Sequence, residues 1–296
     1  MTVTVIGATG NIGSKLTQIL LTLGHTVRAI ARHAEKLQGI NDPNLEPTIG
    51  DIADTAFLTR AFTGADAVYT FIPPNPMAPD LSAYSDSVSN SILSAVKASG
   101  VKKVINLSSL GAQSTEKMGV ITGLSRNEAA LNTLPENVTV VHLRPGFFME
   151  NSFSSAAMVK HMGFTGSTVD PNVKISMIAT ADIAAYAAKL IGDEKVKGHV
   201  VAPLLGAYDL TLTEFWEKLG HAVGNPNIKY TQISTEQQVE GLTKYGLSRD
   251  FAENMAEMGH AVNEGKMAVH PRTPENTTPT TVEEFSKQFK AVYDAA

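Results

Sequence analysis

The sequence predicts a doubly wound α/β fold, in which a parallel sheet is covered by helices on both faces. Short β-branched and apolar runs alternate with longer segments that repeat apolar residues every three or four positions. A glycine-rich turn joins the first run to the first helical segment, and the pattern changes after about residue 150. We therefore expect a Rossmann-type domain followed by a smaller, mostly helical C-terminal lobe.

The first apolar run, residues 3–6, leads directly into a turn with three glycines, and a helical segment follows. In a dinucleotide-binding turn, Gly7 permits the sharp bend, Gly10 lets the backbone approach a pyrophosphate, and Gly13 lets the helix pack closely. The free N–H groups at the start of the helix attract phosphate. The alternative is a glycine-rich turn that binds nothing, but the flanking strand and helix favour a nucleotide site. Its predicted residues are Gly7, Thr9, Gly10, Asn11, Ile12 and Gly13.

The second predicted strand, residues 25–32, ends in a cation. An Asp or Glu at this place in such a sheet binds the ribose 2′-hydroxyl of NAD and repels a 2′-phosphate. This chain has Arg32 there and no acid before Glu35. A guanidinium can bind a phosphate through two N–H groups. We therefore predict that the cofactor is NADP(H) in preference to NAD(H), with Arg32 at the 2′-phosphate.

Further strands are predicted at residues 67–72, 104–110 and 137–146. Ligands of open α/β sheets bind beyond the carboxyl ends of the strands, so the residues at these ends should surround one crevice. Asp51 marks another strand end, where it either bonds the adenine or forms a turn. The other cofactor contacts that we expect are Phe71, Ile72, Pro73, Ser108, Pro145, Gly146 and Phe147.

Composition and charge argue against several classes of partner. The 296-residue chain is 43% hydrophobic, carries a net charge of −5 and has no cysteine. An acidic balance gives no attraction for nucleic acid or an anionic membrane, and no apolar segment is long enough to span one. The eight histidines show no metal-binding spacing, so we expect no metal. We expect a cytoplasmic monomer or homodimer that has no targeting segment and acts on a small molecule.

Several motifs resemble those of the NmrA-like group of atypical short-chain dehydrogenases/reductases, in the same order. They are GATGNIG at 7–13, VRAIAR at 27–32, GD at 50–51, GVKKVINLSS at 100–109, RNEAAL at 126–131, LRPGFFMEN at 143–151 and DIA at 182–184. The resemblance implies an NAD(P)(H)-binding protein with a variable C-terminal substrate lobe. Members of the group range from quinone reductases to redox-sensing regulators without evident catalysis.

One departure separates this chain from the ordinary catalytic short-chain dehydrogenases. Those enzymes carry Tyr-xxx-Lys, in which the lysine lowers the tyrosine pKa so that the phenol can exchange a proton with a substrate oxygen. None of the seven tyrosines here has a lysine four positions later, and residues 125–128 stand where the pair would fall. Ser108 or Ser109 matches the family serine. The candidate catalytic residues are therefore Ser109 and Glu128, and ketone reduction has no obvious proton donor.

Quinones avoid this difficulty, because a hydroquinone anion is stable enough to form without a strong positioned acid. Catalysis would then depend mainly on holding nicotinamide and acceptor together in a dry pocket. We expect Phe148, Met149 and Asn151 to line that pocket, and one ring of Phe147 and Phe148 to pack in the core. The predicted function is an NADPH-dependent reductase of quinone-like acceptors. The alternative is an NADP(H)-binding sensor without catalysis.

The remaining sequence predicts how the two parts of the chain are divided. We expect residues 1–150 in the nucleotide-binding domain, with 174–203 returning to it, and residues 151–173 and 204–296 in the substrate lobe. Residues 151–173 are polar and contain glycine, which suggests an irregular segment, whereas 174–178 resemble a strand. Thr180 or Asp182 is expected to cap the next helix. Helices are also predicted at about 235–245 and 250–263, whose methionines suit either a core or an adaptable pocket wall.

Overall fold

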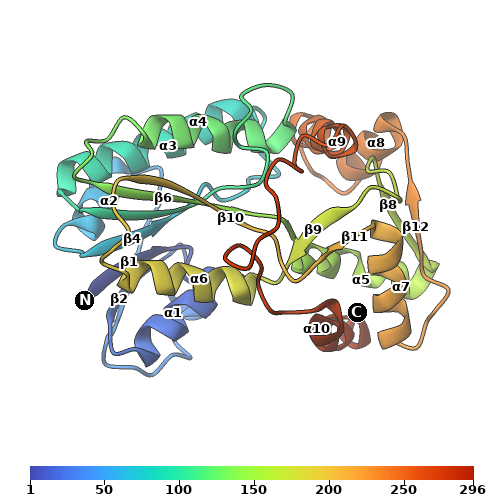
Figure 1. Cartoon of the computed structure of the whole chain (residues 1–296), viewed down its shortest axis with the longest axis horizontal. Helices are drawn as coiled ribbons and strands as arrows, with labels where there is room; N and C mark the ends of the chain where they lie inside the picture. The colour runs from blue at the N-terminus through green and yellow to red at the C-terminus, as the bar shows by residue number, and fades with distance from the viewer.

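A seven-stranded, fully parallel sheet forms the centre of the larger domain (Figure 1). The computed structural model describes residues 1–296. The strands lie in the order β10-β6-β5-β4-β1-β2-β3. Strands β2 and β3 are thus added on one side of β1 and the later strands on the other, so the strand order reverses between β1 and β4. Their bounds are β1 Thr2–Ile6, β2 Thr26–Ala31, β3 Leu45–Ile49, β4 Ala67–Thr70, β5 Lys103–Leu107, β6 Thr139–Pro145 and β10 His199–Leu204. The predicted fold class is confirmed, and the reversal creates the crevice in which such sheets bind ligands.

Helices cover both faces of this sheet (Figure 1). Helices α1 Gly13–Thr22 and α6 Thr180–Gly192 pack on one face, and α2 Thr55–Phe62, α3 Leu81–Ser99 and α4 Thr122–Leu131 pack on the other. Strand residues alternate between the two cores: Val3 and Val5 pack beneath α1, whereas Ile6 packs beneath α2 and α3. None of the helices has the length and apolar character needed to cross a membrane.

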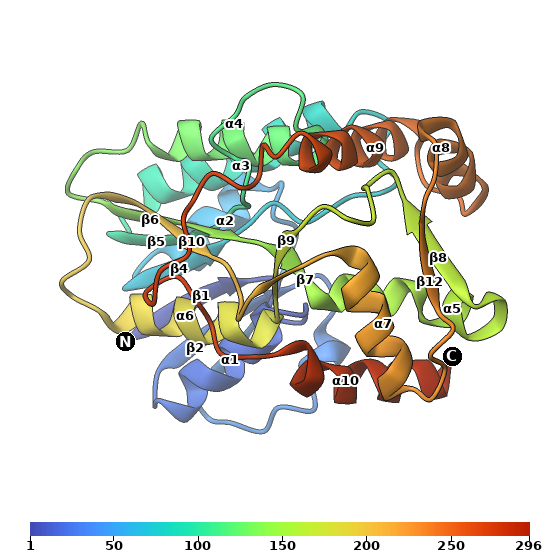
Figure 2. The ribbon, with the colours of Figure 1, turned by 45° about the vertical axis from the view of Figure 1, so that its right-hand side comes forward.

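The smaller lobe combines helices with two short sheets (Figure 2). Strands β7 Phe147–Phe148, β9 Ile175–Ile178 and β11 Asp209–Leu210 form one sheet, and β8 Phe164–Ser167 pairs with β12 Lys229–Gln232. The helices of the lobe are α5 Ala156–Met162, α7 Leu212–Ala222, α8 Thr235–Lys244, α9 Arg249–Asn263 and α10 Val282–Ala295, with the 3-10 helix η3 Met149–Ser155 before α5. Two further 3-10 helices, η1 Ala34–Lys36 and η2 Gly119–Ile121, belong to the larger domain. Phe215, Trp216, Phe285 and Phe289 form the centre of the lobe core.

Two expectations about residues 151–182 are wrong. The segment expected to be irregular contains η3, α5 and β8, because Ala156 and Val159 recur at helical spacing and pack in the lobe core. Neither expected residue caps α6. The helix begins after Ala179, which has no side-chain cap, and Asp182 instead accepts hydrogen bonds from the backbone and hydroxyl of Thr280.

A buried polar network ties α3 and α4 to the sheet. Asn106 accepts a hydrogen bond from Asn127 at 3.0 Å, and Ser89 donates to Asn127 at 2.9 Å. Asn106 also donates to His142 Nδ1 at 3.1 Å, so Nε2 carries the proton and donates to Asn132 at 3.0 Å. Every member is satisfied only while His142 is neutral. Burial lowers the pKa of His142 to about 4, an effect that the nearby Glu128 opposes.

We predict that His142 makes the protein acid-sensitive and that His142→Gln reduces this sensitivity. The unfolded chain binds a proton below the ordinary pKa of 6.5, whereas the native imidazole resists protonation down to about 4. The free energy of unfolding therefore falls as pH drops across this interval, by about 3 kcal/mol from this residue. Denaturant unfolding at neutral and mildly acidic pH measures the loss. An equal loss in the wild type and the variant would contradict the assignment.

Candidate cofactor-binding site

Four parallel strands end at the same edge of the main sheet, where the predicted residues follow them. Gly7 follows β1, Phe71 lies just beyond β4, Ser108 follows β5, and Pro145 ends β6. The backbone N–H of Ser108 donates to the Leu143 carbonyl at 2.7 Å, which keeps the ends of β5 and β6 aligned. The structure therefore brings these four residues to one edge, where an open α/β sheet binds its ligands.

The three glycines of the loop 7–13 face different constraints. Gly7 has a φ of +67°, and a Cβ there would lie 2.5 Å from the Phe71 ring. A Cβ on Gly13 would lie 2.1 Å from the Gly7 carbonyl oxygen, so this glycine lets α1 approach the loop itself. A Cβ on Gly10 would meet one atom only, the Gly7 carbonyl oxygen, in a tight contact at 3.3 Å. The fold thus requires glycine at positions 7 and 13, whereas the space beside Gly10 is largely open.

The same loop leaves hydrogen-bond donors free. The N–H of Gly10 donates to the Gly7 carbonyl at 2.9 Å, which closes the turn. The N–H groups of Asn11, Ile12 and Gly13 have no intramolecular acceptor. They lie at the start of α1, where the helix dipole adds partial positive charge. Free backbone N–H groups next to a glycine, which has no side chain to block a ligand, are suited to bind the diphosphate of a dinucleotide.

The predicted adenosine end lies beyond β2 and β3. Arg32 is exposed and forms no ion pair within the chain. Asp51 accepts a hydrogen bond from the Ala53 backbone at 2.9 Å, so its side chain forms a turn, which is the second of the two roles foreseen for it. Tyr84 of α3 lies near both charges: burial raises the pKa of Tyr84, Arg32 lowers it, and Asp51 raises it. Sequence reasoning missed Tyr84, because no motif surrounds it.

The other end of the crevice contains the two serines and two phenylalanines. Ser108 is buried and its hydroxyl has no partner, whereas Ser109 is half-buried. The Phe147 ring meets Phe215 edge to face at 6.5 Å in the lobe core, and Phe148 packs against the core beneath α1 and α6. Both rings therefore pack against a core, where only one was expected to, and the Ser108 hydroxyl is buried without a hydrogen-bond partner.

Residues 1–286 match the family model described as the NmrA-like family. The chain belongs to this family. A match over almost the whole length includes both the sheet and the lobe, and it agrees with the motifs that suggested the resemblance.

Relatives of this NmrA-like chain match it over nearly its whole length. An NAD(P)H azoreductase from Xenophilus azovorans is 26% identical over 295 residues, 99% of each chain. The NADPH-dependent quinone oxidoreductase of Escherichia coli, solved with NADPH, has a TM-score of 0.79 at 23% identity, covering 97% of this chain and 99% of that one. The transcriptional regulator NmrA, solved with NAD, has a TM-score of 0.67 at 15% identity, covering 98% and 91%. The two solved structures share the fold.

In this NmrA-like protein Glu128 forms a buried ion pair with Arg144. Its two carboxylate oxygens accept hydrogen bonds from Arg144 of β6, at 2.9 and 2.5 Å, and both side chains are buried. Both carboxylate oxygens are therefore engaged by the guanidinium and are not turned toward a substrate. The structure therefore argues against Glu128 as an acid catalyst. Arg144 was missed because its partner lies on a different element.

Two of the predicted site residues are buried in a core: Ile72, expected at the cofactor, and Met149, expected in the substrate pocket. Ile72 is buried among the residues beneath α2 and α3, and Met149 is buried in the lobe core, so neither side chain lines the crevice. Asn151 is exposed. Met258 packs against the buried Met118, which supports the core interpretation of that methionine rather than a pocket wall.

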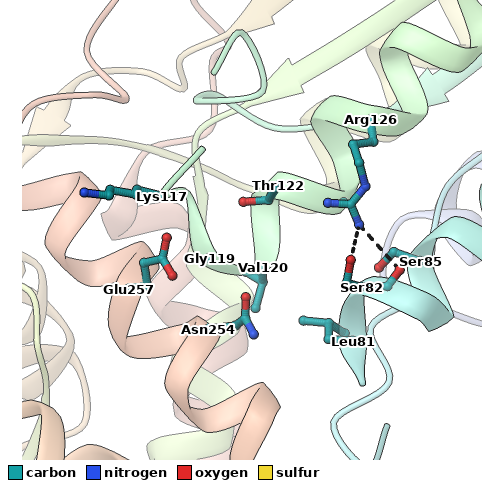
Figure 3. Close-up of a pocket in the computed structure, with 11 residues that line it drawn as sticks. Leu81, Ser82, Ser85, Lys117, Gly119, Val120, Thr122, Arg126, Asn254 and Glu257 are labelled. Carbon is teal, nitrogen blue, oxygen red and sulfur yellow. Dashed lines mark hydrogen bonds between the residues drawn. The ribbon is translucent and has the colours of Figure 1, made fainter. Parts of the chain in front are cut away.

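A polar cavity of about 260 Å³ lies between α3, α4 and α9 (Figure 3). On α4 it is lined by Thr122 and Arg126, whereas Asn127 and Glu128 point to the sheet side of the helix. Arg126 donates to Asp86 at 2.7 Å, and to Ser82. None of these lining residues was among the predicted site residues. Its polar walls make it unlike the apolar pocket expected for a flat acceptor.

Gly10→Val and Gly13→Ala should separate ligand binding from folding. Valine at position 10 meets little protein but occupies the space offered to a diphosphate, so the variant should fold and lose nucleotide binding. Alanine at position 13 clashes with backbone and should destabilise the protein by about 1–3 kcal/mol. Thermal unfolding and nucleotide titration measure the two effects. A folded Gly10→Val variant with wild-type affinity would show that the loop is not the cofactor site.

Proposed function

We propose that this NmrA-like protein is an NADPH-dependent reductase of small electrophilic acceptors, and that quinone-like molecules are its favoured substrates. The observation that carries the proposal is the loop 7–13, which offers free N–H groups beside the open face of Gly10 at the carboxyl edge of the sheet. The full-length similarity to an NAD(P)H azoreductase supports a redox function. The NADPH complex of a quinone oxidoreductase with the same fold supports the choice of cofactor.

Each part of the crevice has a separate task in this proposal. The loop binds the diphosphate, and Arg32 binds the 2′-phosphate. Phe71 and the segment 145–148 border the reacting end and exclude water from it. Bound NADPH supplies a hydride from its nicotinamide ring. The chain therefore contributes binding, orientation and a dry environment, which are the main protein contributions to this chemistry.

The substrate class follows from the absence of a positioned acid. No Tyr-xxx-Lys pair is present, and Glu128 is held by Arg144. Ser109 remains the proposed catalytic hydroxyl, because it is half-buried at the edge of the sheet. A hydroxyl alone is a weak acid at neutral pH, which favours acceptors whose reduced anion is stable.

The remaining features of the proposal concern the molecule as a whole. We place the nucleotide-binding domain at residues 1–150 with 174–203, and the substrate lobe at 151–173 and 204–296. Helix α6 and strand β10 pack with the main sheet, while β9 belongs to the small sheet. The absence of cysteine suits a reducing compartment such as the cytoplasm, where we expect a monomer or homodimer.

Arg32→Ala should abolish the preference for NADPH over NADH. Arg32 is exposed and unpaired in the chain, so its contact with a 2′-phosphate should favour NADPH by about ten-fold. Titration of wild type and variant with both nucleotides measures this preference. Lys36→Ala, an exposed cation in η1, is the matched control and should keep it. Equal affinities of the wild type for both nucleotides would refute the assignment.

A second candidate function is nucleotide sensing without catalysis. The missing Tyr-xxx-Lys pair and the immobilised Glu128 favour it, and the regulator NmrA has the same fold and binds NAD. In this case the crevice binds NADP(H) without transferring a hydride, and the lobe binds a partner protein that responds to the nucleotide.

Acceptor specificity distinguishes the two functions. NADPH oxidation should be readily detectable with small quinones and about 10²–10⁴-fold slower with simple ketones, because a ketone needs its alkoxide protonated as it forms. Spectrophotometric assays with both acceptor classes provide the comparison. Tight NADPH binding without turnover of any acceptor would favour the sensor. Fast ketone reduction without quinone activity would reveal a proton donor that the structure does not identify.

A further inference from the structure

A chain of hydrogen bonds connects the two walls of the proposed cofactor crevice, which are the loop 7–13 and the chain around the segment 145–148. Lys15 Nζ donates to the Asn11 carbonyl at 2.9 Å and to the Thr180 hydroxyl at 3.0 Å. That hydroxyl donates to Glu150 Oε1 at 2.5 Å, and the backbone N–H of Thr180 lies 3.0 Å from both carboxylate oxygens. Asn11 lies in the loop 7–13, whereas Glu150 follows the segment 145–148.

Glu150 is buried and depends on these partners. Only 4% of the residue is exposed, and a buried carboxylate is strongly unfavourable unless it is paired. Helix α6 has no side-chain cap of its own, so Glu150 supplies the acceptor at its N-terminus. Lys15 Nζ adds a positive charge 4.0 Å from Oε1. The carboxylate therefore fixes the start of α6 and, through Lys15, the start of α1.

The position of this relay gives it a consequence for the crevice. Lys15 holds the Asn11 carbonyl from the side of α6, and the adjacent N–H groups remain free for a ligand. Glu150 lies two residues after Phe148, in the opposite wall. A dinucleotide must contact both walls together, and a shift of about 1 Å in either wall can strongly impair binding or reaction.

We propose that Lys15 and Glu150 are positioning residues that set the separation between the phosphate-binding loop and the segment 145–148. Neither residue needs to contact the nucleotide. The inference rests on the proposed NADPH site. It also implies that loss of either residue breaks the same set of hydrogen bonds, so the effects of the two losses should not add.

Simple electrostatics gives a different expectation, which makes the inference testable. Removing the Lys15 charge would weaken binding of an anionic nucleotide, whereas removing the Glu150 charge would strengthen it. If the two residues position the walls, both removals weaken binding. The direction of the effect at Glu150 therefore separates positioning from charge.

The test uses Lys15→Met, Glu150→Gln and the double variant of the full chain. NADPH dissociation constants come from fluorescence titration, and melting temperatures are measured without nucleotide. Each single variant should weaken NADPH binding by about five-fold, and the double variant should be no weaker than the weaker single one. Lys15→Arg keeps the donor and should restore binding. Lys160→Met, which removes a lysine bonded to the Asp294 carbonyl, is the matched control and should bind normally.

Tighter binding by Glu150→Gln, or strictly additive effects in the double variant, would overturn the inference. So would variants that melt at lower temperature but keep wild-type affinity, because the relay would then serve stability alone. If Glu150→Gln does not fold, Thr180→Val decides, because it removes the hydroxyl that links Lys15 to Glu150 without changing any charge: weaker NADPH binding supports positioning, and unchanged affinity overturns the inference. Failure of the wild type to bind NADPH would instead refute the proposed function, and the inference with it.

Discussion

The crevice depends on the close approach of the first residue of α1 to the carbonyl of Gly7. Only a residue without a side chain fits at Gly13, so the helix can begin directly against the turn. That contact aims the first N–H groups of α1 along the carboxyl edge of the sheet. The parallel alignment of β1, β4, β5 and β6 then brings Phe71, Ser108 and Pro145 to the same edge. A wider turn would separate donors from the rest of the site.

Helix α4 shows how a catalytic position can become a structural one. In this chain the helix is held to the sheet by Glu128 with Arg144 and by Asn127 with Asn106. These contacts give hydrogen-bond partners to buried charged and amide groups, whose burial without partners would destabilise the fold. The Glu128 carboxylate is thereby committed to holding β6. Chemistry at the crevice then relies on what the cofactor and the acceptor can do without a strong acid.

Local sequence patterns predicted the fold class and the glycine loop, but they did not predict contacts between elements that are far apart in the sequence. The spacing of the glycines and the apolar runs predicted β1, α1 and the order of the sheet elements, because each depends on neighbouring residues. Glu128 was predicted as a catalytic residue because nothing near it in the sequence reveals its contact with Arg144 of β6. Likewise, Glu150 caps α6 from thirty positions away, and α5 was obscured by polar residues before it.

The path of the chain has a consequence for how the protein is made. The main sheet receives its edge strand, β10, only after the polypeptide has passed through η3, α5 and β8 of the lobe. The lobe in turn lacks α10 Val282–Ala295, with its fully buried Phe285 and Phe289, until that segment has been synthesised. The main sheet therefore has all its strands once β10 has been made, whereas the lobe core is complete only after α10. Long-range pairings of this kind slow folding, so the lobe should reach its native structure last.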